Sequence, residues 1–383
     1  METAELINIL AQGEDSYHQF KVNLTNGNAI AAELVAFSNT NGGKLIVGVD
    51  DEGQVVGLEQ EQIASLNQLL ANAASQSVKP AINPISENII LPGGTVVVIH
   101  VAQGLNKPYM DNQGYIWIKS GADKRRVTAR EDLQRMFQQS ALIHADEVPV
   151  ANTSVQDIDY RYFEQFFERQ YGATIAEYAD SLLQLLTNMN LINNNQLNIA
   201  ATLLFATDPQ FKLPAFVVKA VAFPGVDITD ENYIDSRDVQ GKLADVFQQT
   251  LSFILANIRH VQNEQNVNSI GEPEIPRIAI EELLANALIH RDYFVSAPIR
   301  VFVFADRIEL ISPGHLPNNL TIENIKLGNS NIRNPILASF AAKLLPYRGL
   351  GSGIRRALSA YPHIDLIEDK GANTFTVVIK RTS

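Results

Sequence analysis

The strongest pattern in the chain is the stretch Glu281-Glu282-Leu283-Leu284-Ala285-Asn286-Ala287-Leu288-Ile289-His290-Arg291-Asp292-Tyr293. It predicts a helix on which Glu282, Asn286 and His290 are spaced i, i+4 and i+8 and form one polar stripe. Asparagine is a poor helix former, but its amide oxygen suits Mg2+. A carboxylate one turn away can polarise a water for attack on a phosphate. Taken alone, the stripe also fits the solvated face of an amphipathic helix.

Two further motifs follow this helix. Ser312-Pro313-Gly314-His315-Leu316-Pro317 comes after a predicted hairpin, Arg300–Phe304 and Arg307–Ile311. Farther on, Arg348-Gly349-Leu350-Gly351-Ser352-Gly353 opens another predicted helix. Alternating glycines let the backbone approach a ligand closely, and amides at a helix N-terminus favour phosphate. The order of these elements is far more specific than any one of them.

In this order, residues from about 270 to 383 resemble the GHKL ATPase domain of gyrase, heat-shock chaperones, histidine kinases and mismatch-repair proteins. The divergent branch in bacterial proteins described as transcriptional regulators or RecG-like helicases is closer still. The resemblance implies an α/β sandwich that holds ATP and Mg2+, with Glu282 as the water-activating, catalytic carboxylate and Asn286 as the metal ligand. The residues it assigns to nucleotide binding are Asn286, His290, Asp292, Ser312, Gly314, Arg348, Gly349, Gly351 and Gly353.

The chain departs from the active GHKL pattern at the base-binding box. That pattern has an Asp-x-Gly-x-Gly box whose carboxylate accepts from the adenine amino group. This chain has Ser312-Pro313-Gly314 instead, so only a hydroxyl is offered there. The sequence also contains no Walker-type GxxxxGK[ST] loop, which a RecG-type helicase motor needs. We therefore expect nucleotide binding with at most weak ATPase activity, and no helicase activity.

The N-terminal segment carries a second ordered set of motifs. Glu14 to Lys21 precedes a predicted helix that ends in Ala36-Phe37-Ser38-Asn39-Thr40-Asn41-Gly42-Gly43. A predicted strand and the turn Asp50-Asp51-Glu52-Gly53 follow. Over about residues 10–140 this order resembles the Schlafen AlbA-type domain. The resemblance implies nucleic-acid binding, to DNA or RNA.

Some Schlafen proteins cut tRNA with three acidic residues. The resemblance places these near Glu14, position 19 and Asp51 or Asp50, but position 19 is Gln19. An amide cannot supply the negative charge that a metal-dependent cleavage needs. We expect a degenerate nuclease site, and so binding without cleavage.

The nucleic-acid contact is expected at a basic cluster, because the chain as a whole is acidic. Its members are Lys21, Lys119, Lys124, Arg125, Arg126 and Arg130. Tyr109, Tyr115 and Trp117 lie close by in sequence and could stack on bases. The alternative is a solvated turn whose aromatic neighbours belong to the core.

Composition bounds these interpretations. The chain has 383 residues, a hydrophobic fraction of 46%, no cysteine, and a net charge of -12. These values are typical of a globular protein without disulfides or thiolate metal sites. The N-terminus lacks a signal-peptide pattern and no apolar run is long enough to span a bilayer, so we expect a cytoplasmic protein without a membrane partner.

The segments are predicted to form three domains in a mixed α/β (α+β) chain. Residues 1–145 would be the Schlafen AlbA-type domain, 146–270 a mostly helical connector, and 271–383 the GHKL-like ATP-binding domain. Within the connector, an acidic stretch from Asp227 to Asp238 is predicted to be a surface loop.

Three hypotheses about function follow. The first is a transcriptional regulator that binds nucleic acid and is switched by ATP and Mg2+. The second is a Schlafen-type RNA nuclease that acts on tRNA, for example in phage defence. The third is a degenerate scaffold with protein partners only. Whether the chain forms a homo-oligomer stays open.

Overall fold

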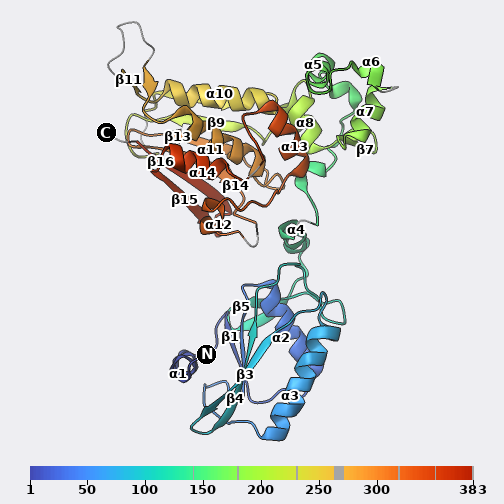
Figure 1. The fold of residues 1–383 in the computed structure, drawn as a ribbon, viewed down its shortest axis with the longest axis vertical. Helices are drawn as coiled ribbons and strands as arrows, with labels where there is room; N and C mark the ends of the chain where they lie inside the picture. The colour runs from blue at the N-terminus through green and yellow to red at the C-terminus, as the bar shows by residue number, and fades with distance from the viewer. Residues whose placement is uncertain are drawn as a thin grey trace. The chain divides into compact units, whose positions relative to one another are not determined.

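A computed structural model of the chain describes residues 1–140, 142–178, 181–229, 232–262, 271–317, 320–349 and 351–381. Two compact units are present, Met1–Ile143 and His144–Ser383, and each is treated by itself (Figure 1). Both mix helices with β-sheet, which confirms the predicted α/β class. Among the described residues, none of the helices combines the length and the hydropathy needed to cross a bilayer.

The first unit is built on a four-stranded sheet. Its strands, in spatial order, are β1 (His18–Lys21), β2 (Gly43–Val47), β4 (Gly94–Val101) and β3 (Ile85–Leu91). β1 and β2 are parallel, and the other two pairs are antiparallel. Helices α2 (Gly27–Asn39) and α3 (Gln60–Asn72) pack on one face through a core that includes Phe37 and Val97. Helix α1 (Thr3–Gln12) covers the other face around Phe20.

The predicted glycine turn after α2 is confirmed. Gly42 has φ +73, and a Cβ there would lie 2.7 Å from the carbonyl oxygen of Val101. Only glycine tolerates both the left-handed backbone and this close approach. Farther along, β5 (Trp117–Ser120) and β6 (Asp123–Arg126) form a hairpin that leads to α4 (Arg130–Gln139). The Asn39 side chain at the end of α2 donates to the carbonyls of Tyr109 and Trp117, which holds this hairpin against the helix.

The second unit is built on a six-stranded sheet. Its strands, in spatial order, are β10 (Asp235–Val239), β9 (Val218–Ala222), β13 (Ile299–Val303), β14 (Arg307–Pro313), β16 (Thr374–Lys380) and β15 (Ile364–Asp369). Only the β9–β13 pair is parallel. The predicted acidic loop is therefore wrong in part, because Asp235–Val239 is an edge strand in which Arg237 and Asp238 are exposed. Asp230 and Glu231 of that prediction lie outside the described residues.

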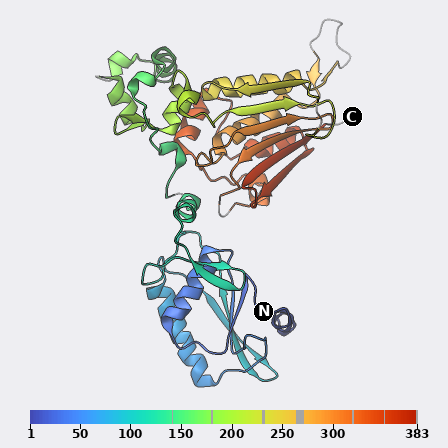
Figure 2. The same ribbon diagram turned by 180° about the vertical axis from the view of Figure 1, so that it is seen from behind.

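Helices cover one face of this sheet. They are α10 (Leu243–Ala256), α11 (Arg277–His290) and α14 (Gly353–Ala360), whereas α13 (Pro335–Leu344) packs beside α11. Figure 1 looks onto these helices, whereas Figure 2 looks onto the strands from behind. Apolar residues of α11 such as Leu284 and Ile289 are fully buried against the sheet. Because these apolar residues pack on the sheet, the polar stripe of α11 lies on a different side of the helix.

The second unit has further elements, several of which join the same core. They are the helices α5 (Tyr160–Tyr171), α6 (Ile175–Tyr178), α7 (Leu182–Asn188), α8 (Ile199–Phe205), α9 (Pro209–Lys212) and α12 (Ile322–Lys326), and the short pairs β7 (Ile192–Asn193) with β8 (Gln196–Leu197) and β11 (His260–Val261) with β12 (Glu272–Pro273). One hydrophobic cluster runs from Phe163 of α5 through Phe205 to Ile379 of β16. The predicted boundary at 270/271 adjoins residues 263–270, which lie outside the described residues, and the three-domain division stays a prediction.

A buried carboxylate supports the start of α13. Asp146 is fully buried, and one of its oxygens accepts from the backbone N–H of Leu337 at 2.9 Å. The other oxygen has no hydrogen-bond partner. Burial raises the pKa of Asp146 to about 6, although backbone N–H groups of α13 oppose the shift. The folded state therefore holds this proton more tightly than the unfolded chain does.

We predict that Asp146→Asn stabilises the protein at neutral pH. Because the pKa of Asp146 is raised in the folded state, its protonation stabilises the fold fully below the pKa of the unfolded chain, near 4. This contribution is lost as the pH rises through about 6. The asparagine stays neutral and keeps an acceptor for Leu337. The expected gain in the free energy of unfolding is on the order of 2–3 kcal/mol at pH 8 and close to zero at pH 4. Urea unfolding at both pH values measures it; an equal gain at both would contradict the assignment.

Candidate nucleotide and nucleic-acid sites

The polar stripe of α11 lines a hollow in the second unit. Glu282, Asn286 and His290 all face it, as the sequence predicted. The Asn286 side chain folds back along the helix, where its N–H donates to the Glu282 carbonyl at 2.6 Å. The amide oxygen is the atom of Asn286 that could bind a cation. The stripe is therefore the wall of a hollow and not a plain solvated face.

The glycine-rich turn approaches this stripe directly. Gly349 and Gly351 have φ values of +66 and +68, which glycine adopts without strain. Gly353 begins α14, and a Cβ on it would lie 2.7 Å from Glu282 Oε2 and 2.8 Å from Asn286 Nδ2. No side chain fits between the first turn of α14 and the stripe. Two motifs about 70 residues apart in the sequence thus form one wall.

The Glu282 carboxylate is almost fully buried and forms an ion pair with Arg356 of α14. Its second oxygen, Oε2, has no hydrogen-bond partner. Burial raises the pKa of Glu282, and the charges of Arg356 and Arg348 oppose the rise. A buried carboxylate with a raised pKa is a suitable proton acceptor near neutral pH, but here a guanidinium holds it.

The end of β14 forms the opposite side of the hollow. The Ser312 hydroxyl donates to the Ala287 carbonyl of α11 at 3.3 Å, which leaves its lone pairs to accept. Gly314 has φ +98, and a Cβ there would lie 2.5 Å from the Cβ of Asp292. Asp292 therefore lies behind Gly314 and not in the wall of the hollow. Its carboxylate accepts from the Phe294 N–H. Asp292 is the one predicted nucleotide-binding residue that does not line the hollow.

Several lining residues were not predicted from the sequence, among them Tyr347 and Arg333. The Tyr347 hydroxyl lies 3.1 Å from Nε2 of His290. Burial, helped by the charge of Arg333, lowers the pKa of His290 to about 4, so its imidazole is neutral at pH 7. Arg333 donates to the His315 carbonyl at 2.7 Å. Tyr347 directly precedes the glycine motif, which is a usable signal, whereas nothing local singles out Arg333.

The hollow has a polar wall and an apolar wall. It contains about 1020 Å³ of empty space, part of it open to solvent. The apolar wall consists of Leu310, Leu316, Leu320, Ile325, Phe375 and Val377. This division suits a ligand with an anionic end and a flat apolar end. Nowhere in the described ranges do three or more His, Asp or Glu side chains converge as a metal site, so Mg2+ would need ligands from the nucleotide together with Asn286.

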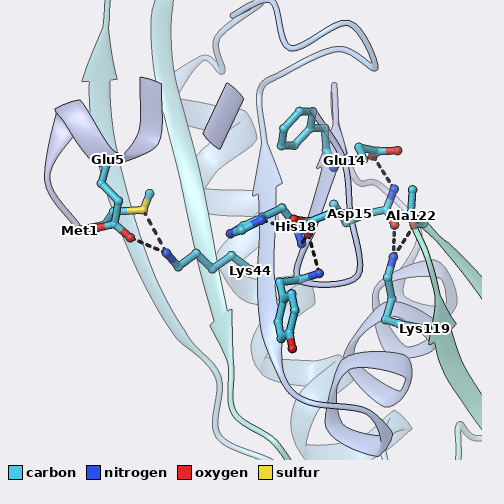
Figure 3. Close-up of polar contacts among 11 residues, drawn as sticks. Met1, Glu5, Glu14, Asp15, His18, Lys44, Lys119 and Ala122 are labelled. Atoms are coloured by element: carbon cyan, nitrogen blue, oxygen red, sulfur yellow. Dashed lines mark hydrogen bonds and ion pairs between the residues drawn. The ribbon is translucent and has the colours of Figure 1, made fainter. Parts of the chain in front are cut away.

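In the first unit, each lysine of the predicted basic cluster interacts with a residue of the same unit, although only Lys119 is buried. Lys119 is buried and donates to the Gln19 side chain and the Ala122 carbonyl (Figure 3). Lys124 is paired with the buried Glu33, and Lys21 lies 3.9 Å from Glu14. Burial lowers the pKa of Lys119. These lysines are poor candidates for direct phosphate contacts.

The arginines of the cluster are exposed. The Arg126 guanidinium stacks on the Tyr115 ring, 3.2 Å from its centroid, and Arg125 lies 3.1 Å from Asp132. Arg130 is exposed at the start of α4. Tyr109 is buried, so of the predicted stacking residues only Tyr115 and Trp117 are within reach of a ligand. The exposed part of the predicted cluster therefore lies on and beside the β5–β6 hairpin, and its contact with nucleic acid stays a prediction.

The predicted degenerate nuclease site is only partly assembled. The Gln19 amide donates to the Glu14 carboxylate, which also accepts from the Phe20 N–H at 2.7 Å (Figure 3). Gln19 therefore links Glu14 to Lys119 in one polar chain. Asp51 is exposed at its turn and makes no hydrogen bond or ion pair with the described residues.

Comparison with family models identifies both ends of the chain. Residues 14–128 match the family "Schlafen, AlbA_2". Residues 296–379 match the family "Putative ATP-dependent DNA helicase recG C-terminal". The two predicted resemblances are confirmed: the chain carries a Schlafen AlbA_2 domain followed by a RecG C-terminal type, ATPase-like domain. The second match begins beyond α11, so the roles of Glu282 and Asn286 stay predictions.

Two solved structures are similar to the chain. A crystal structure of a protein from Corynebacterium diphtheriae is 22% identical, with a TM-score of 0.47, over 99% of this chain and 80% of that one. A solution NMR structure of the N-terminal domain of a protein related to the ATP-dependent DNA helicase RecG, from Nitrosomonas europaea, is 23% identical, with a TM-score of 0.25, over 34% of this chain and 97% of that one. No curated protein matches the chain.

We predict that Lys119→Met destabilises the first unit and that Arg126→Ala does not. The methionine keeps the buried stem but leaves Gln19 and the Ala122 carbonyl without their donor, at a cost of about 1–3 kcal/mol. Arg126 is exposed and its loss leaves no buried group unpaired. Trp117 is the only tryptophan of the chain, so its fluorescence during urea unfolding reports this unit. Equal midpoints for the two variants would show that Lys119 is not structural.

Proposed function

We propose that the protein binds nucleic acid through the β5–β6 hairpin and binds ATP with Mg2+ in the hollow of its second unit, and that the nucleotide switches its conformation. The observation that carries the ATP half is the contact of Gly353 with Glu282 and Asn286. It brings a glycine-rich helix N-terminus, an amide oxygen and a carboxylate into one wall. The family matches support a nucleic-acid-binding protein of ATPase type, and the resemblance noted from the sequence supports transcriptional regulation as its process.

The roles proposed for the site residues follow from their positions. The free N–H groups of the first turn of α14 would bind phosphate oxygens. The Asn286 oxygen would hold Mg2+, which supplies positive charge to the phosphate chain when it is bound. The base would lie against the apolar wall, with the Ser312 oxygen as acceptor for an amino group. Arg356 holds Glu282 in the nucleotide-free protein, so hydrolysis requires this pair to separate first, and we expect a protein that uses ATP mainly as a bound signal.

The nuclease alternative is weaker. Gln19 contributes no charge at the position where a metal would need a second acid. Its side chain donates to Glu14 and accepts from the Lys119 ammonium. A buried cation at that point opposes binding of another cation. We therefore propose that the first unit binds nucleic acid without cutting it.

We predict that ATP with Mg2+ raises the melting temperature of the second unit. At a ligand concentration of one hundred times Kd, the stabilisation is about 2.7 kcal/mol, which corresponds to roughly 5 °C or more. Asn286→Ala should remove the part of the shift that depends on Mg2+. Asn257→Ala is the matched control, because Asn257 also donates to the carbonyl four residues back but lies outside the hollow. Calorimetry with and without EDTA measures both; no shift at millimolar ATP would refute the proposal.

We predict that charge reversal at Arg125 and Arg126 weakens nucleic-acid binding. Each lost phosphate contact lowers the slope of log K against log salt by about 1, so the double variant should lower it by about 2. Quenching of Trp117 should accompany binding if a base stacks beside it. Arg161→Glu, an exposed arginine of the second unit, is the control. An unchanged slope in the double variant would place the contact elsewhere.

A further inference from the structure

Arg356 holds a position that the proposed function does not explain. It lies one turn into α14, three residues after Gly353, and its guanidinium reaches back to Oε1 of Glu282. The side chain lines the hollow beside the glycine-rich turn. Its Nε–H is buried and has no acceptor. Across the same contact, Glu282 Oε2 is buried and has no donor.

This ion pair is incompletely satisfied on both sides. A buried donor or acceptor that lacks a partner costs free energy, and a buried ion pair is stable only when its remaining hydrogen-bonding positions are filled. A guanidinium offers five N–H groups in a planar fork, which suits a phosphate with several acceptor oxygens. An anion in the hollow would give the buried Nε–H the acceptor that Glu282 does not provide.

The surroundings favour a phosphate over other anions. Ser352 and Gly353 at the start of α14 line the hollow, and Ser352 makes no side-chain cap hydrogen bond there. Arg348, also in the wall, adds positive charge near Glu282. Arg355, which directly precedes Arg356 on α14, is exposed and does not line the hollow. The two neighbouring arginines are therefore placed for different tasks.

We propose that Arg356 is a two-position phosphate-binding residue that pairs with Glu282 when the hollow holds no nucleotide and donates to the phosphate chain when a nucleotide is bound. This inference rests on the proposed function and adds its regulation. Movement of Arg356 uncovers the Glu282 carboxylate only when the nucleotide is in place. The ligand class is a nucleotide that carries a phosphate chain, because the guanidinium of Arg356 and the start of α14 both line the hollow and both suit phosphate oxygens.

Competition between two anions for one guanidinium has a measurable consequence. If Glu282 and the phosphate compete for Arg356, removal of the Glu282 charge must strengthen nucleotide binding, since the free protein no longer holds the arginine back. A purely structural ion pair predicts the reverse, because Glu282→Gln would loosen α14 and weaken binding. The sign of this one change separates the two accounts.

The test is calorimetric titration of the full chain with a non-hydrolysable ATP analogue and Mg2+. Arg356→Ala should weaken binding by about 10–100-fold, the value of a charge-assisted hydrogen bond, and Arg356→Lys by less. Glu282→Gln should tighten binding by about 3–10-fold, because one competing charge is removed. The double variant should bind like Arg356→Ala. Arg355→Ala is the matched control and should stay within about twofold of the unchanged protein.

Each outcome is decisive. Failure of the unchanged protein to bind the analogue overturns the proposed function and the inference together. Binding by the unchanged protein that Arg356→Ala leaves intact overturns the inference alone. So does weaker binding by Glu282→Gln, which indicates a structural clamp. If Arg356→Ala does not fold, Arg356→Lys and Glu282→Gln still decide, because the predicted changes have opposite signs.

Discussion

The structure of the second unit depends on the approach of α14 to the polar stripe of α11. Gly353 lies so close to Glu282 and Asn286 that even a methyl group would contact both. This approach turns a stripe on one helix and a turn near the end of the chain into a single wall. The six-stranded sheet fixes the distance, because the apolar side of α11 packs on it while the polar side is left to meet α14. The hollow, its polar wall and its apolar wall all follow from this one contact.

Both units hold charged groups in internal pairs close to the surfaces where a ligand is expected. In the first, Gln19 joins Glu14 to Lys119, so the polar chain is satisfied and rigid. In the second, the Glu282–Arg356 pair leaves one buried atom on each side without a partner. A satisfied network supports a fold, whereas an unsatisfied one is ready to change partners. The Lys124–Glu33 pair of the first unit also leaves one buried oxygen of Glu33 without a partner, so only the chain Glu14–Gln19–Lys119 is a satisfied network.

Much of the fold and of the candidate site could be predicted from the sequence, because the informative motifs are local. Helical spacing predicted the stripe on α11, which spans Arg277–His290. Turn chemistry predicted Gly42, Gly349 and Gly351. Burial could not be predicted in the same way: Lys119 counts as basic in the sequence, yet the α2 contact of its hairpin buries it. Arg333 and Arg356 act through partners far away in sequence, and β10 forms only because β9 lies beside it.

The most direct test of this account is a crystal structure of the full chain with a non-hydrolysable ATP analogue and Mg2+. It should place phosphate oxygens between Asn286 and the backbone of residues 349–353, with the base against Phe375 and Val377 and the Arg356 guanidinium on the phosphate chain. The account would be contradicted by an analogue bound elsewhere, or by a Glu282–Arg356 ion pair that stays intact at saturating nucleotide.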